Sequence, residues 1–246
     1  MRDKITSGTA ESCALTIGTF DGVHRGHAAL VETARAAVGP AGRVVAMPFD
    51  PHPLAALRPD AAPARLSHFD QRRGWLYEAG ADEVHRLEPT PEQLSQSPET
   101  FIRNCAERHR PTHIVEGRDF RFGARRAGDV TMLRKLGERF GFEVIVVDAV
   151  EAALMNQQLV TVSSTMIRWL VRRGRVRDAA LLMGRPYTLR GPVVPGDQRG
   201  RTIGLPTANI DCDDQLLPHD GVYAGTARRA DGTTFPAAIS VGTKPT

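Results

Sequence analysis

The chain has 246 residues, of which 41% are hydrophobic and 24% charged, a composition that is ordinary for globular proteins and excludes a largely disordered chain. No apolar run approaches the roughly 20 residues of a membrane-spanning helix, and residues 1–13 lack the apolar stretch of a signal peptide. The net charge is +4, and the three cysteines are far apart with no CxxC pair. We therefore expect a cytoplasmic protein without a disulfide framework or a membrane partner.

The first two thirds of the chain alternate strand and helix patterns, which predicts a Rossmann-like α/β domain with a parallel sheet over residues 1–182. Short apolar runs closed by glycine or proline predict strands, and capped segments with apolar residues at helical spacing predict helices. In chain order, we expect strand 14–17, helix 27–38, strand 43–47, helix 67–78, strand 83–87, helix 98–106, strand 113–115, helix 129–140, strand 142–147 and helix 164–171.

From about residue 183 onward, glycine and proline become frequent and the apolar runs become short. These features predict an antiparallel β domain over residues 183–246, similar to a partial β-barrel. Its expected strands are 187–189, 193–194, 222–223 and 237–241. Because the sequence stops directly after a strand-like run, we expect this β domain to be truncated.

The most informative segment is Gly-Thr-Phe-Asp-Gly-Val-His-Arg-Gly-His, residues 18–27, which follows the first predicted strand. In a helix that begins near His24, His24 and His27 lie on one face at the end where free N–H groups favour anions. Three glycines allow the backbone to turn sharply and to approach a ligand closely: Gly18, Gly22 and Gly26. The segment therefore predicts a triphosphate cradle, with a surface loop or a zinc site as alternatives.

This segment resembles the nucleotidyltransferase signature of pantetheine-phosphate, nicotinamide-mononucleotide and flavin adenylyltransferases. The resemblance implies that His24 and His27 are catalytic and stabilise the α-phosphate of ATP while the phosphate of the second substrate attacks it. Catalysis would then rest on positioning and electrostatic stabilisation, without a covalent intermediate. The resemblance also implies an ATP site formed by Gly18, Thr19, Phe20, Asp21, Gly22 and Gly26.

Two later segments, Phe-Asp-Pro-His-Pro at 49–53 and Gly-Arg-Asp-Phe-Arg-Phe-Gly at 117–123, resemble segments of prokaryotic bifunctional riboflavin kinase/FAD synthetases. An isoalloxazine ring needs a flat apolar wall and a few polar contacts. The resemblance implies that such a site includes Pro51, His52, Asp119 and Phe122. A rigid proline-rich turn and phenylalanines in the core are the alternative interpretations.

Glu116 departs from the family pattern, which leads us to expect an apolar residue just before Gly117. We expect its carboxylate to be exposed or paired with Arg118 or Arg121.

Ser-Ser-Thr-Met-Ile-Arg at 163–168 resembles the Ser-Ser-Thr-x-Ile-Arg element of the same superfamily. Ser163 or Ser164 would cap the helix that follows. The resemblance implies that Ser164 and Thr165 bind ATP phosphates and that Arg168 is catalytic through a charge-assisted bond to them. The element would complete the first site from the opposite end of the domain.

The β domain contains Gly-Leu-Pro-Thr-Ala-Asn at 204–209, which resembles the nucleotide loop of riboflavin kinases. The resemblance implies that Gly204, Thr207 and Asn209 bind nucleotide, and that Thr207 and Asn209 hold Mg²⁺, an ion that prefers oxygen ligands.

Together these segments identify the chain as a member of the bifunctional family, with Mg²⁺ as cofactor and ATP, FMN and riboflavin as substrates. The expected reaction transfers AMP from ATP to FMN and releases FAD and pyrophosphate. We expect no nucleic-acid partner, and we leave a homo-oligomer open. A truncated β domain would phosphorylate riboflavin poorly. The alternatives are another phosphorylated acceptor such as phosphopantetheine, or a non-catalytic flavin- or RNA-binding protein.

Overall fold

The computed structural model describes residues 12–196, 207–212 and 214–242. Two compact units divide the chain. The first comprises residues up to 63 together with 69–150, and the second comprises 64–68 together with the residues from 151 onward. These units are defined by internal contacts, so the expected family domains 1–182 and 183–246 stay predictions.

The first unit is a three-layer α/β structure around five parallel strands in the order β3-β2-β1-β4-β5. Its elements are β1 (Cys13–Gly18), α1 (Arg25–Val38), β2 (Arg43–Pro48), α2 (Pro53–Leu57), η1 (Pro59–Ala61), α3 (Phe69–Glu78), β3 (Glu83–Val84), α4 (Pro91–Ser95), α5 (Pro98–His109), β4 (His113–Gly117), η2 (Ala124–Arg126), α6 (Val130–Phe140) and β5 (Glu143–Val147). The predicted parallel sheet is confirmed.

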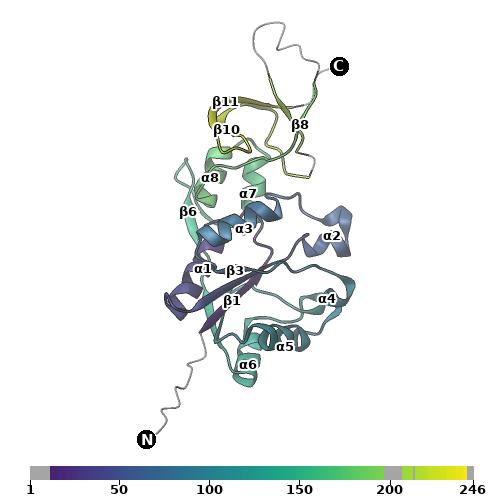
Figure 1. The fold of residues 1–246 in the computed structure, drawn as a ribbon, viewed down its shortest axis with the longest axis vertical. Helices are drawn as coiled ribbons and strands as arrows, with labels where there is room; N and C mark the ends of the chain where they lie inside the picture. The colour runs from purple at the N-terminus through teal and green to yellow at the C-terminus, as the bar shows by residue number, and fades with distance from the viewer. Residues whose placement is uncertain (1–11, 197–206, 213, 243–246) are drawn as a thin grey trace, which may run out of the picture. The chain divides into compact units, whose positions relative to one another are not determined.

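Both faces of the sheet are buried, as parallel sheets require. The helices α1 and α3 cover one face, and α5 and α6 cover the other (Figure 1). The strand β1 is mostly apolar because both of its faces are buried: Ala14 packs toward α1, whereas Leu15 and Ile17 pack toward α5. The central strands therefore lie in the core, and the loops at their carboxyl ends carry the polar residues of interest.

The second unit contains a hairpin, two helices and two further antiparallel pairs, β8–β9 and β10–β11 (Figure 1). Its elements are β6 (Glu151–Ala153), β7 (Leu159–Thr161), α7 (Ser164–Val171), α8 (Val176–Met183), β8 (Val193–Val194), β9 (Asn209–Ile210), β10 (Gly221–Arg228) and β11 (Thr234–Val241). The expected change from parallel to antiparallel strands is confirmed. Among the described residues, no helix is long and apolar enough to cross a bilayer.

Two predicted strands are wrong in extent. Strand 83–87 is reduced to β3, Glu83–Val84. The pairing with β2 nevertheless continues beyond it, because His85 N donates to Ala46 O and Leu87 N donates to Pro48 O, both at 2.9 Å. Residues 187–189 form no strand, because the side chain of Gln215 takes the place of a neighbouring strand. Its Oε1 accepts a hydrogen bond from Arg190 N at 2.7 Å, and its Nε2 donates to Thr188 O at 3.3 Å.

Candidate active site

The loop between β1 and α1 is forced into a tight turn by positive φ angles at three positions. These are Phe20 at 49°, Gly22 at 79° and Val23 at 36°. Glycine adopts such a conformation readily, but a β-branched valine does so only under strain of about 1–3 kcal/mol. Val23 is 2% exposed and its N–H donates to Phe20 O at 3.0 Å, so packing and the turn hydrogen bond hold the strained backbone. The turn places His24 at the N-cap position of α1.

His24 and His27 form a reciprocal cap at the start of α1. The Nδ1 atom of each ring accepts a hydrogen bond from the backbone N–H of the other residue at 3.3 Å. The rings are stacked, with centroids 3.6 Å apart and planes 16° from parallel. Because both Nδ1 atoms act as acceptors, the hydrogen of each neutral imidazole is on Nε2. The two Nε2–H groups therefore form adjacent donors at the positive end of a 14-residue helix.

Phe20 supports this pair from inside the core. Its side chain is fully buried, and its ring centroid lies 5.1 Å from that of His27. A Cβ on Gly18 would stand 3.4 Å from Phe20 Cε2, an ordinary contact, so the Phe20 ring lies directly against the end of β1. Asp21 is also buried, at 6% exposure. The structure thus describes Phe20 as a core residue, and the adenosine contact expected for Phe20 and for Gly18–Thr19 stays a prediction.

Arg72, on α3, joins two loops at the carboxyl edge of the sheet. Its Nη1 donates to Thr19 O at 2.8 Å and to Phe49 O at 2.9 Å, and its Nη2 forms an ion pair with Asp50. Arg72 and Asp50 are each 3% exposed. Asp50 also pairs with Arg86 at 2.5 Å. Sequence reasoning missed Arg72, because an arginine within a helix gives no signal of a buried tertiary contact.

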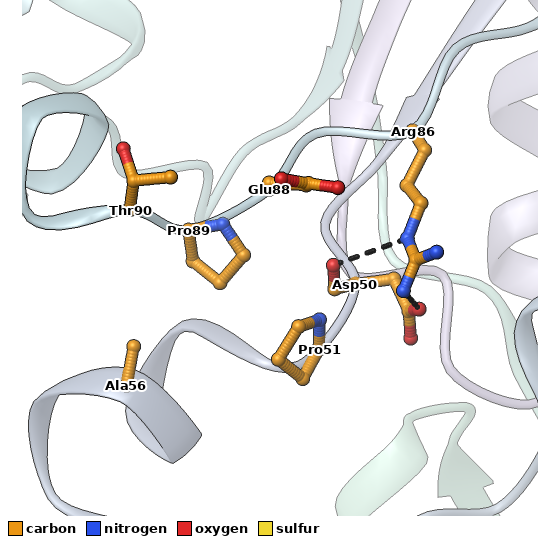
Figure 2. A pocket seen from close by; sticks show the side chains of 7 residues that line it. All are labelled: Asp50, Pro51, Ala56, Arg86, Glu88, Pro89 and Thr90. Carbon is orange, nitrogen blue, oxygen red and sulfur yellow. Dashed lines mark hydrogen bonds and ion pairs between the residues drawn. The ribbon is translucent and has the colours of Figure 1, made fainter.

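The expected flavin residues Pro51 and His52 follow this cluster. His52 caps α2 through its Nδ1, which accepts from Leu54 N at 3.1 Å. A pocket of about 240 Å³ lies beside them, with Pro51 and Ala56 on one side and Pro89 and Thr90 on the other (Figure 2). Its lining residues are Asp50, Pro51, Ala56, Arg86, Glu88, Pro89 and Thr90. Ligand clefts usually measure roughly 300–1,000 Å³, so this pocket alone is smaller than a typical ligand site.

The second expected flavin segment follows β4. Phe122 is 5% exposed and belongs to the core, where its ring lies 5.3 Å from Phe120 and 6.4 Å from Phe101 between centroids. Asp119 is exposed, whereas Phe120 is half-buried. The structure thus supports the core interpretation for Phe122, and its contact with flavin stays a prediction, as does that of Asp119.

Glu116 is not where the sequence suggested. It is 2% exposed, and its Oε1 accepts a hydrogen bond from Ile17 N at 2.6 Å. The expected partner Arg118 instead pairs with the exposed Asp148 at 2.6 Å, and Arg121 Nη1 donates to Phe120 O. Burial, together with the nearby charge of Asp119, raises the pKa of Glu116 well above its usual value. The expectation of an exposed or arginine-paired carboxylate is therefore wrong.

In the second unit, Ser163 is the N-cap of α7, and its Oγ accepts from Met166 N at 3.2 Å. Ser164 and Thr165 occupy the first turn of this helix. Arg168 is 8% exposed, and its Nε donates to Ala64 O at 2.7 Å, which fixes the plane of the guanidinium. The local structure is therefore an ordered helix start with a restrained arginine one turn later.

In the expected kinase loop, Gly204 lies outside the described residues, and Thr207 and Asn209 are exposed. A Cβ on Gly196 would stand 1.9 Å from Asn209 Nδ2, so the β8 side of the pair needs glycine there. The described residues contain no group of three or more His, Cys, Asp or Glu side chains arranged to hold a metal ion.

Comparison with known families covers nearly the whole sequence. A family model described as FAD synthetase matches residues 6–166, and one described as riboflavin kinase matches residues 183–246. The bifunctional riboflavin kinase/FMN adenylyltransferase of Escherichia coli strain K12 is 36% identical over 248 residues, covering 98% of this chain and 76% of the relative. The chain belongs to this bifunctional family.

A second member of the family and one solved structure are also similar to this chain. The bifunctional riboflavin kinase/FMN adenylyltransferase of Listeria monocytogenes is 35% identical, covering 93% of this chain and 71% of the relative. The crystal structure of a macrolide-efflux protein from Streptococcus pneumoniae is 31% identical with a TM-score of 0.82, covering 97% of this chain and 77% of that one. The chain is therefore similar to the bifunctional family in sequence, and to this solved structure in sequence and in backbone.

Both catalytic domains of the bifunctional family are present in the chain. The expectation of weak riboflavin phosphorylation rests only on where the sequence stops. This expectation is not kept, because the family model described as riboflavin kinase matches residues 183–246.

Proposed function

We propose that the chain transfers AMP from ATP to FMN, producing FAD and pyrophosphate, and that its riboflavin kinase domain phosphorylates riboflavin to FMN. The observation that carries the first activity is the stacked pair His24 and His27, whose Nε2–H groups lie side by side at the start of α1. Membership of the bifunctional family supports both activities.

In the proposed transfer, a phosphate oxygen of FMN attacks the α-phosphorus of ATP, and the bond from that phosphorus to the bridging oxygen of pyrophosphate breaks. Negative charge shifts onto the α-phosphate oxygens and the leaving group in the transition state. His24 and His27 donate hydrogen bonds from Nε2 to these oxygens. Their rings are already held by reciprocal caps, so little reorganisation is needed when the charge develops.

We assign the leaving pyrophosphate to Ser164, Thr165 and Arg168. Support comes from the capped start of α7 and from the Arg168 guanidinium, whose orientation is fixed by its bond to Ala64 O. A planar guanidinium with a fixed direction suits phosphate oxygens better than a mobile one.

We assign the flavin to Pro51, His52, Asp119 and Phe122, all of which belong to loops at the carboxyl edge of the parallel sheet. Ligands bind at this edge in open α/β sheets. The pocket beside Pro51 supports this assignment, because Pro51, Ala56 and Pro89 give it apolar surface and the other lining residues add polar groups: Asp50, Arg86, Glu88 and Thr90.

Mg²⁺ would be held in the kinase domain by the Thr207 hydroxyl and the Asn209 side-chain oxygen. Both residues are exposed and offer the hard oxygen donors that this ion prefers. When bound, the ion would neutralise phosphate charge. A cytoplasmic location and the lack of a nucleic-acid or membrane partner stay predictions, as does a homo-oligomer.

The test of adenylyl transfer is to incubate the chain with ATP, Mg²⁺ and FMN and to separate the flavins chromatographically. FAD and pyrophosphate should appear in equal amounts. A folded chain that makes no FAD would contradict the proposal, and turnover of phosphopantetheine in place of FMN would favour the other acceptor. Flavin or RNA binding without turnover would favour a binding protein.

Two variants distinguish the loss of a catalytic histidine from a general effect of replacing a histidine. His27→Ala should abolish most FAD formation. His113→Gln should not, because His113 is at the amino end of β4, at the opposite edge of the sheet. A separate assay with riboflavin, ATP and Mg²⁺ tests the kinase. A folded chain without FMN formation would refute this second activity.

A further inference from the structure

The sheet reverses its order of strands between β1 and β4. From β1 the chain builds outward to β2 and β3 on one side and then to β4 and β5 on the other. Open α/β sheets bind ligands in the crevice at such a reversal, because the connections leave the two central strands in opposite directions. Groups at the carboxyl ends of β1 and β4 therefore line the part of the sheet where the substrates are expected.

The two strands separate before they reach these ends. The β1–β2 ladder runs to Gly18↔Pro48 and the β4–β5 ladder runs to Gly117↔Val147. The β1–β4 ladder, by contrast, pairs only Ala14↔His113 and Leu15↔Ile114.

The separation removes the usual strand acceptor from Ile17 N–H. The backbone groups of Cys13, Leu15 and Ile17 face β4, as the bond from Thr112 N to Cys13 O at 2.8 Å shows. Glu116 supplies the acceptor in place of the backbone, through the 2.6 Å bond from Ile17 N to its Oε1. A buried N–H without an acceptor would be strongly unfavourable. By accepting this hydrogen bond, Glu116 allows β1 and β4 to separate without leaving a buried N–H unsatisfied.

We propose that Glu116 is a positioning residue for adenylyl transfer, which ties the end of β1 to the start of the 117–123 loop. This inference rests on the proposed function. Ile17 directly precedes Gly18 and Thr19 of the nucleotide loop, and Glu116 directly precedes the expected flavin loop. One hydrogen bond thus sets the spacing between the two loops. Glu116 is 2% exposed, so it acts through these loops and not by touching substrate.

The tie depends on the protonation state of Glu116. Two titratable groups face it, Cys105 from α5 and Asp119 from the flavin loop. Asp119 Oδ1 lies 3.1 Å from the position of a Cβ on Gly117, which places that carboxyl over the end of β4. Burial raises the pKa of the Cys105 thiol to about 12, so it is uncharged at neutral pH. A neutral Glu116 suits this setting, because burial disfavours the ionised carboxyl by more than the hydrogen bond from Ile17 N favours it. Ionisation therefore favours opening of the core to water, at the expense of this bond.

The experiment compares Glu116→Gln, Glu116→Val and the control Glu143→Gln with the wild type. Glu143 is a carboxylate on the adjacent strand β5 and its side chain is 73% exposed. For each protein, kcat and KM for FMN adenylylation and the Kd for FMN, from flavin fluorescence, are measured between pH 6.5 and 10. Thermal unfolding at each pH verifies that the variants are folded.

Glutamine keeps the acceptor but cannot ionise, so Glu116→Gln should match the wild type at pH 7 and should hold its FMN affinity at alkaline pH. The wild type and Glu143→Gln should lose affinity about tenfold over this range, the change expected for about 1.4 kcal/mol. Glu116→Val leaves Ile17 N–H without its acceptor and should lower kcat/KM about tenfold at every pH.

The inference is overturned if Glu116→Gln follows the alkaline decline of the wild type, or if Glu116→Val equals Glu116→Gln. If the wild type binds FMN with a pH profile that depends on Glu116 but makes no FAD, the proposed function is wrong and the structural role of Glu116 stands. A wild type that neither binds FMN nor makes FAD removes both.

Discussion

The dual role of His24 allows its chemistry to be separated from its structural contribution. As the N-cap of α1, its Nδ1 accepts from His27 N, and as a donor it presents Nε2–H. His24→Asn keeps a side-chain acceptor at the cap but lacks the outer N–H of the ring, whereas His24→Ala removes both. The two substitutions should therefore have the same effect on turnover and different effects on stability.

The magnitudes follow from the two hydrogen-bonding roles. Asparagine is among the preferred N-cap residues, so His24→Asn should change the free energy of unfolding by no more than about 0.5 kcal/mol, whereas His24→Ala should lose about 1 kcal/mol. Removing one preorganised donor to a developing oxyanion lowers kcat about 100- to 1,000-fold. Both variants should show this loss, because both lack Nε2–H.

The assay measures FAD formation at saturating ATP and FMN, with urea denaturation of each variant in parallel. Ser97→Ala is the matched cap control: Ser97 Oγ accepts from Thr100 N at 3.1 Å at the start of α5. It should lose about 1 kcal/mol of stability with unchanged kcat. If His24→Asn retains kcat within fivefold of the wild type, His24 is only a cap and the donor assignment is wrong.

Three further predictions concern buried ionisable groups. Asp50→Asn should lower the free energy of unfolding by about 3 kcal/mol, because it leaves the Arg72 guanidinium buried beside a neutral amide. A loss of less than about 1 kcal/mol, measured by urea denaturation, would contradict this. Glu116→Gln should be more stable than the wild type at pH 8 but equal to it at pH 4, because a raised pKa in the folded state makes stability fall as the pH rises above the ordinary glutamate pKa of 4.5. The same difference in stability at both pH values would refute this. Burial and the neighbouring His85 lower the pKa of His109 from 6.5 to about 4, so stability should be fully present above pH 6.5 and fall by up to about 3 kcal/mol as the pH drops to 4. His109→Gln should weaken that acid dependence in denaturation curves at pH 7 and pH 4, and an unchanged dependence would exclude His109 as its source.

The parts of the fold that were predictable are those set by local patterns. Apolar runs and capping residues such as Ser97 and Ser163 depend on neighbours within a few residues, so strand and helix positions followed from the sequence. Residues 187–189 were mispredicted because their hydrogen bonds go to Gln215, more than 20 residues away in sequence. The sequence pattern of residues 187–189 does not indicate a contact with a residue so far along the chain.

The same distinction applies to the candidate site. His24 and His27 could be found because they belong to the ten-residue run 18–27, which combines their spacing with three glycines and resembles a nucleotidyltransferase signature. Glu116 was misplaced because its burial depends on where β1 and β4 separate, which is a property of the assembled sheet. The strain at Val23 could not be predicted either, since only the completed turn imposes its positive φ angle.

The pairing of Arg72 with Asp50 has a consequence for sequence evolution in this family. One planar guanidinium satisfies two backbone carbonyls and a carboxylate that belong to different loops, a geometry that the compact ammonium of lysine does not reproduce. Loss of Asp50 leaves the buried Arg72 without its carboxylate, and loss of Arg72 leaves the buried Asp50 with Arg86 as its ion-pair partner. Positions 50 and 72 should therefore change together among related sequences, and a lineage that has lost the arginine should also have lost the aspartate.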